Sequence, residues 1–216
     1  MLIVGSGSIA RRYLRVSKYL NYLTFQTSRS GNRCSEDADI LFLEFTEARS
    51  RSFDLVVICS ATVQHAQDIL DFSSQPAILV EKPVLSNLRQ LSRAISDLED
   101  KLWVSSPLRQ MESFGFFESY LASRTREIVQ ATIVCKSNLD LWRPERDPNK
   151  GYWGSRSQGG ILRELVHELD YADFLFKDLK LVSAKLERSA KYSFLAPSKA
   201  ELSLLSGGVI NVSVHL

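Results

Sequence analysis

The chain has 216 residues, of which 44% are hydrophobic and 24% are charged, and its formal net charge is +2. This composition is that of a globular protein with a hydrophobic core and excludes a chain that is disordered throughout. At about 100–200 residues per domain, the length allows one large domain or two small ones. Lysines and arginines are scattered among acidic residues, which argues against nucleic acid as a partner and leaves small anionic ligands.

The apolar segments and the cysteines together predict a cytoplasmic protein. No apolar run approaches the ~20 residues of a membrane span, and no signal peptide is visible, so we expect no membrane partner. The three cysteines, Cys34, Cys59 and Cys135, are odd in number and widely spaced. This pattern fits reduced structural thiols better than a disulfide framework or a zinc site, so we expect no bound metal.

Strand and helix patterns alternate through the first half of the chain. Apolar runs predict strands at residues 2–4, 23–27, 55–59, 77–80 and 102–105, and helices at residues 9–22, 64–72 and 87–98, whereas residues 40–48 are ambiguous. A continuous apolar run such as the one at 55–59 is typical of a parallel strand with helices on both faces. We therefore expect a doubly wound α/β Rossmann domain over residues 1–107.

After Pro107 the pattern changes to that of an α+β domain. It predicts helices at residues 114–122 and 161–176, strands at residues 127–135, 181–186, 200–205 and 209–214, and a long loop at 138–158. Ser206-Gly207-Gly208 joins the last two strands in a hairpin pattern. We expect an open, mostly antiparallel and incomplete sheet over residues 108–216.

A glycine-rich turn follows the first strand at the spacing of a dinucleotide fingerprint, Gly5-x-Gly7-x-x-Ala10. Its glycines allow a sharp turn and a close approach of the backbone to a pyrophosphate, and the start of the next helix favours phosphates. A tight structural turn is the alternative, but the place between a strand and a helix favours cofactor binding. The expected cofactor contacts are Gly5, Ser6, Gly7, Ser8, Ile9 and Ala10.

The second strand ends in Ser28-Arg29-Ser30, where an NAD enzyme commonly has an acidic residue for the ribose hydroxyls. A guanidinium at this place would bind a 2′-phosphate, and the two serines would add donors. We therefore predict NADP in preference to NAD. The alternative is that Arg29 is a solvated loop residue.

Glu81-Lys82-Pro83 ends the apolar run at residues 77–80. A lysine at the end of a buried parallel strand faces the crevice in which α/β folds bind cofactors, and Pro83 restricts the backbone there. We predict that Lys82 acts on the substrate beside the nicotinamide ring and that all three residues border the cofactor. An ion pair of Glu81 with Lys82, or with another neighbour at the strand end, is the alternative.

The helix expected at 161–176 follows Gly159-Gly160 and places Glu164, His167, Asp170 and Tyr171 at spacings of three and four. These polar groups would share one side of a single helix, where a carboxylate favours the charged imidazolium that an acid/base histidine needs. We predict that His167 is catalytic and that Glu164 or Asp170 orients it. A solvated polar face with a capped histidine is the alternative.

Two further groups of residues are candidates for the site. Ser60, Ala61, Thr62 and His65 follow the strand at 55–59, where the nicotinamide half of a cofactor would lie. The long loop contains aromatic and cationic residues of the kinds that stack on sugars and bind phosphates, and they can equally be packing anchors. The expected substrate contacts in this loop are Trp142, Arg143, Tyr152 and Arg156.

These motifs, in this order, resemble the family of glucose-fructose oxidoreductase, inositol dehydrogenase and rhizopine-catabolism proteins, written Gfo/Idh/MocA. The resemblance covers nearly the whole chain. It implies a Rossmann domain that binds NAD(P), an open-faced sheet that forms homo-oligomers, and hydride transfer at a carbinol of a sugar or cyclitol. It also implies that Lys82 is the catalytic lysine, that His167 is the acid/base histidine, and that Arg109 contacts the substrate.

The run His167-Glu168-Leu169-Asp170-Tyr171 looks most like family members of surface-polysaccharide and sugar-nucleotide metabolism. Three departures stand beside this likeness. Arg163 occupies the place of the Asp that often precedes the histidine by four residues, and Ala61 replaces a proline. The chain also ends in what looks like the middle of the sheet, as a shortened gene product or a fragment would.

Three hypotheses follow from these features. The first is an NADP-preferring oxidoreductase of a sugar or sugar nucleotide. The second is a non-catalytic dinucleotide-binding protein, degenerate through truncation, that serves as a partner or sensor. The third is a defective fragment without a stable function.

Overall fold

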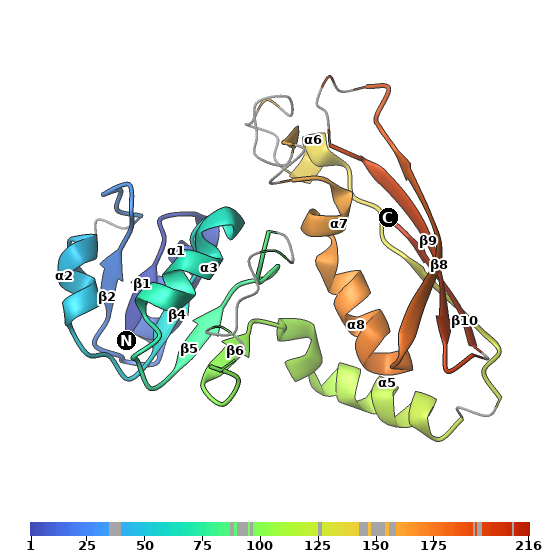
Figure 1. Ribbon diagram of the computed structural model, residues 1–216, viewed down its shortest axis with the longest axis horizontal. Helices are drawn as coiled ribbons and strands as arrows, with labels where there is room; N and C mark the ends of the chain where they lie inside the picture. The colour runs from blue at the N-terminus through green and yellow to red at the C-terminus, as the bar shows by residue number, and fades with distance from the viewer. Residues whose placement is uncertain are drawn as a thin grey trace. The chain divides into compact units, whose positions relative to one another are not determined.

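The computed structural model describes residues 1–34, 40–86, 89, 95, 97–124, 127–142, 147, 154–155, 159–191, 193, 196–208 and 210–216. The chain divides into two compact units, Met1–Ser105 and Ser106–Leu216. The sequence predicted the division after residue 107. Each unit contains one sheet, and the two sheets differ in strand direction (Figure 1).

The first unit is built on a six-stranded parallel sheet with the order β3-β2-β1-β4-β5-β6. The strands are β1 (Leu2–Val4), β2 (Phe25–Thr27), β3 (Leu41–Phe42), β4 (Val56–Ile58), β5 (Ile78–Val80) and β6 (Leu102–Val104). The strand order reverses between β1 and β4, and α/β sheets bind their ligands outside the carboxyl ends of the strands at such a point. The expected doubly wound fold is confirmed.

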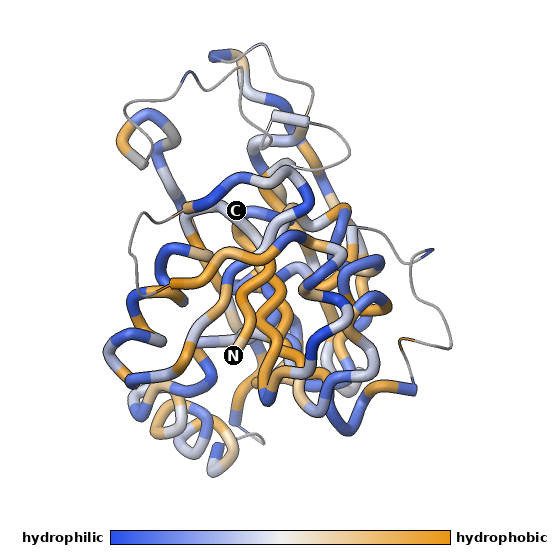
Figure 2. Tube along the Cα trace, turned by 90° about the vertical axis from the view of Figure 1, so that its left-hand side faces the viewer, coloured by the Kyte–Doolittle hydropathy of each residue, from blue (hydrophilic) through white to orange (hydrophobic). Residues whose placement is uncertain are grey.

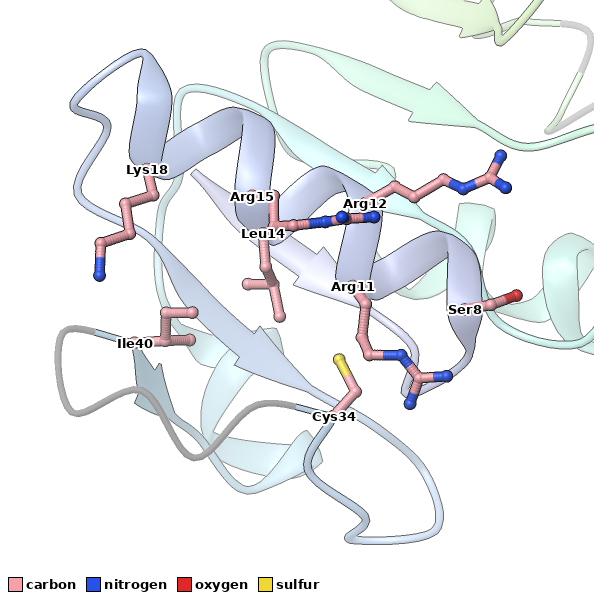
Figure 3. A pocket seen from close by; sticks show the side chains of 8 residues that line it. All are labelled: Ser8, Arg11, Arg12, Leu14, Arg15, Lys18, Cys34 and Ile40. Carbon is pink, nitrogen blue, oxygen red and sulfur yellow. The ribbon is translucent and has the colours of Figure 1, made fainter.

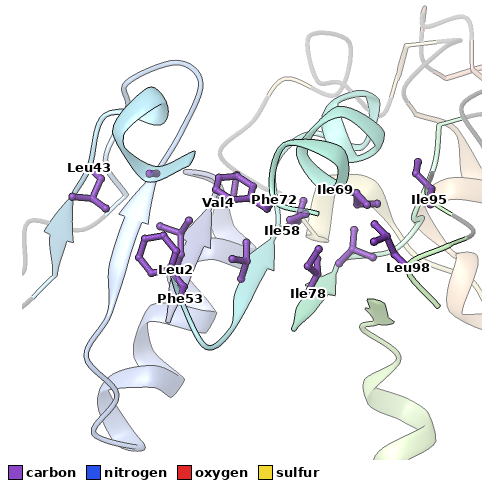
Figure 4. Packing of buried hydrophobic residues seen from close by; sticks show 13 residues of the cluster. Leu2, Val4, Leu43, Phe53, Ile58, Ile69, Phe72, Ile78, Ile95 and Leu98 are labelled. Carbon is purple, nitrogen blue, oxygen red and sulfur yellow. The ribbon is translucent and has the colours of Figure 1, made fainter. Parts of the chain in front are cut away.

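Side chains of the central strands pack on both faces of this sheet. Leu2 and Val4 belong to one buried cluster and Ile3 to another, since successive residues of a strand point to opposite faces. Figure 4 shows the first cluster, which includes Ile69, in α3 (Thr62–Asp71), and Phe72 just after it. The second cluster includes Leu14 of α1 (Ser8–Tyr19). The hydrophobic colouring of the strands near the N-terminus in Figure 2 reflects this two-sided burial.

Several element boundaries in this unit differ from those that the sequence predicted. The first helix ends at Tyr19, before residue 22, because Asn21 adopts a positive φ of 55° and turns the chain toward β2. The ambiguous segment at 40–48 contains β3 and the start of the six-residue helix α2 (Phe45–Ser50). The helix expected at 87–98 lies largely outside the described residues.

The second unit contains a four-stranded sheet with the order β7-β10-β9-β8. Its strands are β7 (Gln130–Val134), β8 (Leu179–Glu187), β9 (Lys199–Ser206) and β10 (Ile210–His215), and its helices are η2 (Pro107–Gln110), α5 (Glu112–Ala122), α6 (Leu139–Trp142), α7 (Ile161–Glu164) and α8 (Val166–Phe176). β7 and β10 are parallel, whereas the other two pairs are antiparallel. Gly207 and Gly208 have positive φ angles in the β9–β10 turn, so the expected hairpin and the mostly antiparallel sheet are confirmed.

The single helix expected at 161–176 is wrong, because the helix breaks at Leu165. This residue has φ −107° and ψ 38°, which ends α7 before α8 begins at Val166. Leu162, Leu165 and Leu169 all pack against the same cluster on the sheet. The three leucines thus reach the sheet across the break, so their helical spacing in the sequence does not require one continuous helix.

None of the helices in the described part of the chain is both long and apolar enough to cross a lipid bilayer.

Candidate functional site

The turn after β1 has the geometry that a dinucleotide-binding turn requires. Gly5 has a φ of 141°, and a Cβ at this position would lie 2.6 Å from the carbonyl oxygen of Cys59 at the end of β4. The Gly5 amide donates to Thr27 O at 2.9 Å, so the turn is fixed between the two neighbouring strands. A side chain is therefore excluded at Gly5 by backbone on β4.

The second glycine faces open space. Gly7 is the N-cap of α1, no side chain caps the helix, and a Cβ on Gly7 would meet no atom within 4 Å. The first backbone amides of a helix lack intrahelical acceptors and attract anions. Gly7, Ser8 and Ile9 thus fit a pyrophosphate, while Ala10 is buried under the sheet and fits close helix packing.

Four cations of α1 line one cavity of about 560 Å³, which Figure 3 shows from close by. They are Arg11, Arg12, Arg15 and Lys18, and Ser8, Leu14, Cys34 and Ile40 complete the lining. The spacing of three and four residues puts Arg11, Arg15 and Lys18 on one side of the helix. The cations are therefore less scattered than the sequence indicated, and their field adds to that of the helix start in favouring an anionic ligand.

Arg29, at the end of β2, is held by two carboxylates of α3. Its Nε lies 2.7 Å from Asp68 Oδ1, its Nη2 pairs with Asp71, and its guanidinium lies 4.2 Å from the centre of the Phe45 ring. Burial alone would lower the pKa of Arg29, but the hydrogen bonds and charges of Asp68 and Asp71 raise it. Arg29 thus lies in an exposed turn, as the alternative expects, but it also belongs to an ion-pair network.

The two serines beside Arg29 differ in exposure. Ser28 is buried and its hydroxyl donates to Asn32 O at 2.8 Å, so it closes the turn after β2. Ser30 is exposed. Of the two hydroxyls, that of Ser30 is the more accessible to a ligand.

The turn between β4 and α3 is fixed by His65. This side chain is 1% exposed, its Nε2 lies 3.1 Å from Ser60 O, and its Nδ1 lies 3.0 Å from Pro83 O. Both ring nitrogens therefore face protein carbonyls, which leaves neither for a cofactor. His65 instead links the turn at Ser60, Ala61 and Thr62 to the segment that contains Lys82.

Glu81 is held by a tyrosine rather than by its neighbouring lysine. Tyr13 of α1 makes hydrogen bonds of 2.8 Å to Glu81 Oε1 and 3.0 Å to Ser105 Oγ, and burial, with a smaller contribution from Glu81, raises the pKa of Tyr13. No ion pair joins Glu81 to Lys82 among the described residues, and the Lys82–Pro83 bond is cis. The predicted alternative of a Glu81–Lys82 ion pair is therefore wrong.

In the second unit Arg109 and Asp170 form a two-pronged ion pair. Arg109 Nε donates to Asp170 Oδ2 at 2.9 Å and its Nη2 to Oδ1 at 2.6 Å, while the guanidinium lies 4.5 Å from the centre of the Phe174 ring. Such bidentate pairs are strong and geometrically specific. The pair joins η2 to α8 and engages both oxygens of Asp170, which leaves Glu164 as the better candidate to orient His167.

The break at Leu165 also changes the expected geometry of the catalytic helix. Glu164 ends α7, whereas His167, Asp170 and Tyr171 lie on α8. The prediction that all four lie on one side of a continuous helix is therefore wrong. The relation between Glu164 and His167 is set by the turn at Leu165 instead.

A contact between Cys135 and Glu168 is one that no sequence pattern predicts. Burial and the Glu168 carboxyl raise the pKa of the Cys135 thiol to about 11, and Glu168 Oε2 is buried with no hydrogen-bond partner in the described part of the chain. Cys34, Cys59 and Cys135 are free thiols, and burial raises the pKa of each. None therefore has the lowered pKa of a nucleophile.

The candidate contacts of the long loop lie outside the described residues. Arg143, Tyr152 and Arg156 fall in the segments that the structure leaves undescribed, and of Trp142 the backbone alone is described, at the end of α6.

The described fold is shared with solved dehydrogenases and oxidoreductases. A WlbA dehydrogenase from Bordetella pertussis, solved with NADH and UDP-GlcNAcA, has a TM-score of 0.81 at 13% identity over 100% of this chain and 68% of its own. A myo-inositol dehydrogenase from Corynebacterium glutamicum has a TM-score of 0.76 at 19% identity over 99% of this chain and 66% of its own. A protein described as an NADPH-dependent oxidoreductase from Desulfitobacterium hafniense has a TM-score of 0.81 at 17% identity over 99% and 65%.

The chain thus spans about two thirds of the length of these structures. No family model matches the sequence, and no curated protein matches it. The resemblance to Gfo/Idh/MocA proteins that the motifs predicted is confirmed at the level of the fold, since dehydrogenases of this type share it along almost the whole chain.

Proposed function

We propose that this chain is a Gfo/Idh/MocA-type, NAD(P)-dependent oxidoreductase that acts on a hydroxyl or keto group of a sugar or sugar nucleotide. The observation that carries the proposal is the place of Lys82, two residues after β5, at the same carboxyl edge of the parallel sheet as a glycine turn that is open to a pyrophosphate. The likeness to dehydrogenase folds, one of them solved with a sugar nucleotide, supports this substrate class.

In this proposal Lys82 and His167 are the catalytic groups. When bound, the cofactor supplies or accepts a hydride. Lys82 holds the substrate oxygen by a charged hydrogen bond, and His167 takes the proton from the hydroxyl during oxidation and returns it during reduction. Histidine suits this exchange because it is the side chain that titrates nearest neutral pH. Glu164 orients the imidazole, and Asp170 acts through its ion pair with Arg109.

NADP remains the cofactor we propose in preference to NAD. No acidic side chain stands at residues 28–30, and both Arg29 and the cations of α1 lie in the same unit as the glycine turn. The fit of Gly7 and the open start of α1 to a pyrophosphate is common to both cofactors.

A screen of purified protein tests the proposed function. NADPH oxidation and NADP reduction are measured by absorbance against a panel of sugars, cyclitols and nucleotide sugars, with NAD(H) in parallel. We expect turnover on at least one nucleotide sugar or sugar and faster turnover with NADP(H). Turnover on simple alcohols alone would contradict the substrate class.

The second candidate is a dinucleotide-binding protein without turnover, which serves as a partner or sensor. The specific observation in its favour is the engagement of Asp170 by Arg109, which leaves one fewer carboxylate for catalysis. Tight binding of either cofactor, with no turnover in the screen, would support this second function over the first.

We also propose that the chain forms homo-oligomers through the sheet of its second unit. β8 is an edge strand of that sheet, and its Leu181 and Val182 side chains are 62% and 66% exposed. Uncovered apolar edge strands are templates for pairing with another chain. We expect sedimentation velocity to give a dimer or larger species that Leu181→Lys weakens, with Phe116→Lys, at an exposed residue of α5 outside the sheet, as the matched control. A strictly monomeric parent protein at high concentration would contradict this proposal.

A further inference from the structure

Two carboxylates, those of Asp68 and Asp71, hold Arg29, and the two side chains differ in how far they are buried. Asp68 is fully buried, with its Oδ1 2.7 Å from Arg29 Nε and its Oδ2 2.5 Å from Ser60 Oγ. It therefore ties the ends of β2 and β4 to α3 as part of the buried structure. Asp71 lies one helical turn later, at the last residue of α3, and its side chain is 7% exposed.

Asp71 lies at the rim of the network, where its contacts are shared. Besides the pair with Arg29, its Oδ1 lies 3.4 Å from Arg49 Nη2 and 3.2 Å from Gln67 Nε2. Arg49 is exposed, so this second pair is screened by solvent. Of the two carboxylates in the network, Asp71 thus lies nearer to solvent. It accepts from Arg29, Arg49 and Gln67.

The geometry of Arg29 is fixed by these contacts and by Phe45. The ring of Phe45 covers one side of the guanidinium at 4.2 Å, and the pairs with Asp68 and Asp71 engage Nε and Nη2. Among the described residues no hydrogen bond or ion pair engages Arg29 Nη1, and the side chain is 35% exposed. An accessible guanidinium edge at the end of β2 is what a 2′-phosphate would bind.

The charge of this network opposes a phosphate more than its arginine suggests. Arg29 and Arg49 contribute two positive charges, and Asp68 and Asp71 contribute two negative ones, so the network is neutral. A phosphate monoester has a charge of about −1.5 to −2 at neutral pH, so a neutral network attracts it less than a net positive one would. The uncharged 2′-hydroxyl of NAD does not lose binding in this way.

Resting on the proposed dinucleotide site, we propose that Asp71 is a specificity-determining residue that restrains the preference for NADP by holding the Arg29 guanidinium. It takes a donor of Arg29 that a 2′-phosphate would otherwise use and places a negative charge at the rim of that site. The site consequently accepts both cofactors, and Asp71 sets the ratio between them. Asp68 has a separate role as the buried anchor of the same guanidinium.

The test is a titration of NADPH and NADH by fluorescence with the parent protein and with Asp71→Asn, Arg29→Ala and the double variant. We expect Asp71→Asn to raise the affinity ratio of NADPH to NADH about tenfold, the effect of one charge-assisted hydrogen bond, with NADH binding changed less than about twofold. In the Arg29→Ala background the same substitution should change the ratio less than about threefold, because Asp71 acts through Arg29.

Asp54→Asn is the matched control, since it removes one negative charge from an exposed position of the same unit and should leave the ratio unchanged. A carboxylate at the last residue of a helix opposes the helix dipole, so Asp71→Asn should fold, and Asp71→Ser serves as a second variant. An unchanged ratio in folded Asp71 variants overturns the inference while the proposed function stands. If Asp71→Asn raises the affinity ratio of NADPH to NADH tenfold in the Arg29→Ala background as well, Asp71 does not act through Arg29. Failure of the parent protein to bind either cofactor overturns both the inference and the proposed function.

Discussion

Replacing Lys82 or His167 by alanine is expected to lower turnover by about 10²–10⁴-fold, because each substitution removes a positioned group that holds or moves the proton of the reacting hydroxyl. NADPH binding should stay within a few-fold of the parent, since the pyrophosphate binds at the glycine turn and not at these side chains. Turnover in the screening assay and fluorescence titration of NADPH measure the two quantities separately.

Two control variants make this expectation sharper. Lys180→Ala removes an exposed lysine of β8 and should change neither turnover nor cofactor binding. Asp170→Asn breaks the ion pair with Arg109 and should lower the thermal stability more than it alters the pH profile of turnover, whereas Glu164→Gln should alter that profile. Near-normal turnover of Lys82→Ala or His167→Ala on the true substrate would remove that residue from the mechanism.

The elements that the sequence predicted well are those in which neighbouring residues suffice. Continuous apolar runs such as Val56–Ile58 predicted central parallel strands, and the structure buries them on both faces. The turn at Gly5 was predictable because its backbone conformation and its approach to Cys59 exclude a side chain. In both cases the local pattern and the tertiary structure have the same requirement.

The contacts that the sequence did not predict join side chains far apart along the chain. Tyr13 holds Glu81 across 68 residues, Arg29 meets Asp71 across 42, and Arg109 meets Asp170 across 61. Polar residues on helix faces carry no local sign of their partner, so the sequence predicts Arg29 as a phosphate ligand and does not reveal the carboxylates that hold it. The periodicity of residues 161–176 likewise gave no sign that packing would break the helix at Leu165.

The sequence predicts His65 as a cofactor contact because it does not reveal the carbonyl groups that its side chain meets. Its place just after a strand of the parallel sheet is that of a ligand contact, but its side chain points into the protein and lies between Ser60 O and Pro83 O. A histidine on an amphipathic helix can face either side of that helix, and the neighbouring sequence does not decide which. The structure thereby changes His65 from a contact to a support of the segment that contains Lys82.

Alanine substitutions at the two glycines of the turn are expected to differ in what they disturb: at Gly5 the stability of the fold, and at Gly7 the binding of the cofactor. Gly5→Ala forces a Cβ to within 2.6 Å of Cys59 O at a φ of 141°, so it should lower the free energy of unfolding by about 3 kcal/mol or more. Gly7→Ala meets no atom within 4 Å and should cost about 1 kcal/mol at most, as a poorer N-cap.

Cofactor binding should be affected strongly by the substitution at Gly7, although the stability of the fold is not. A methyl group there occupies the space in which the backbone approaches the pyrophosphate, so Gly7→Ala should weaken NADPH and NADH binding by about 10–100-fold at nearly unchanged melting temperature. Thermal denaturation and fluorescence titration of both variants measure the two effects, and Gly115→Ala, on the exposed helix α5, is the control. Parental affinity in Gly7→Ala would remove the glycine turn from the cofactor site, because the predicted obstruction acts on the pyrophosphate that both cofactors share.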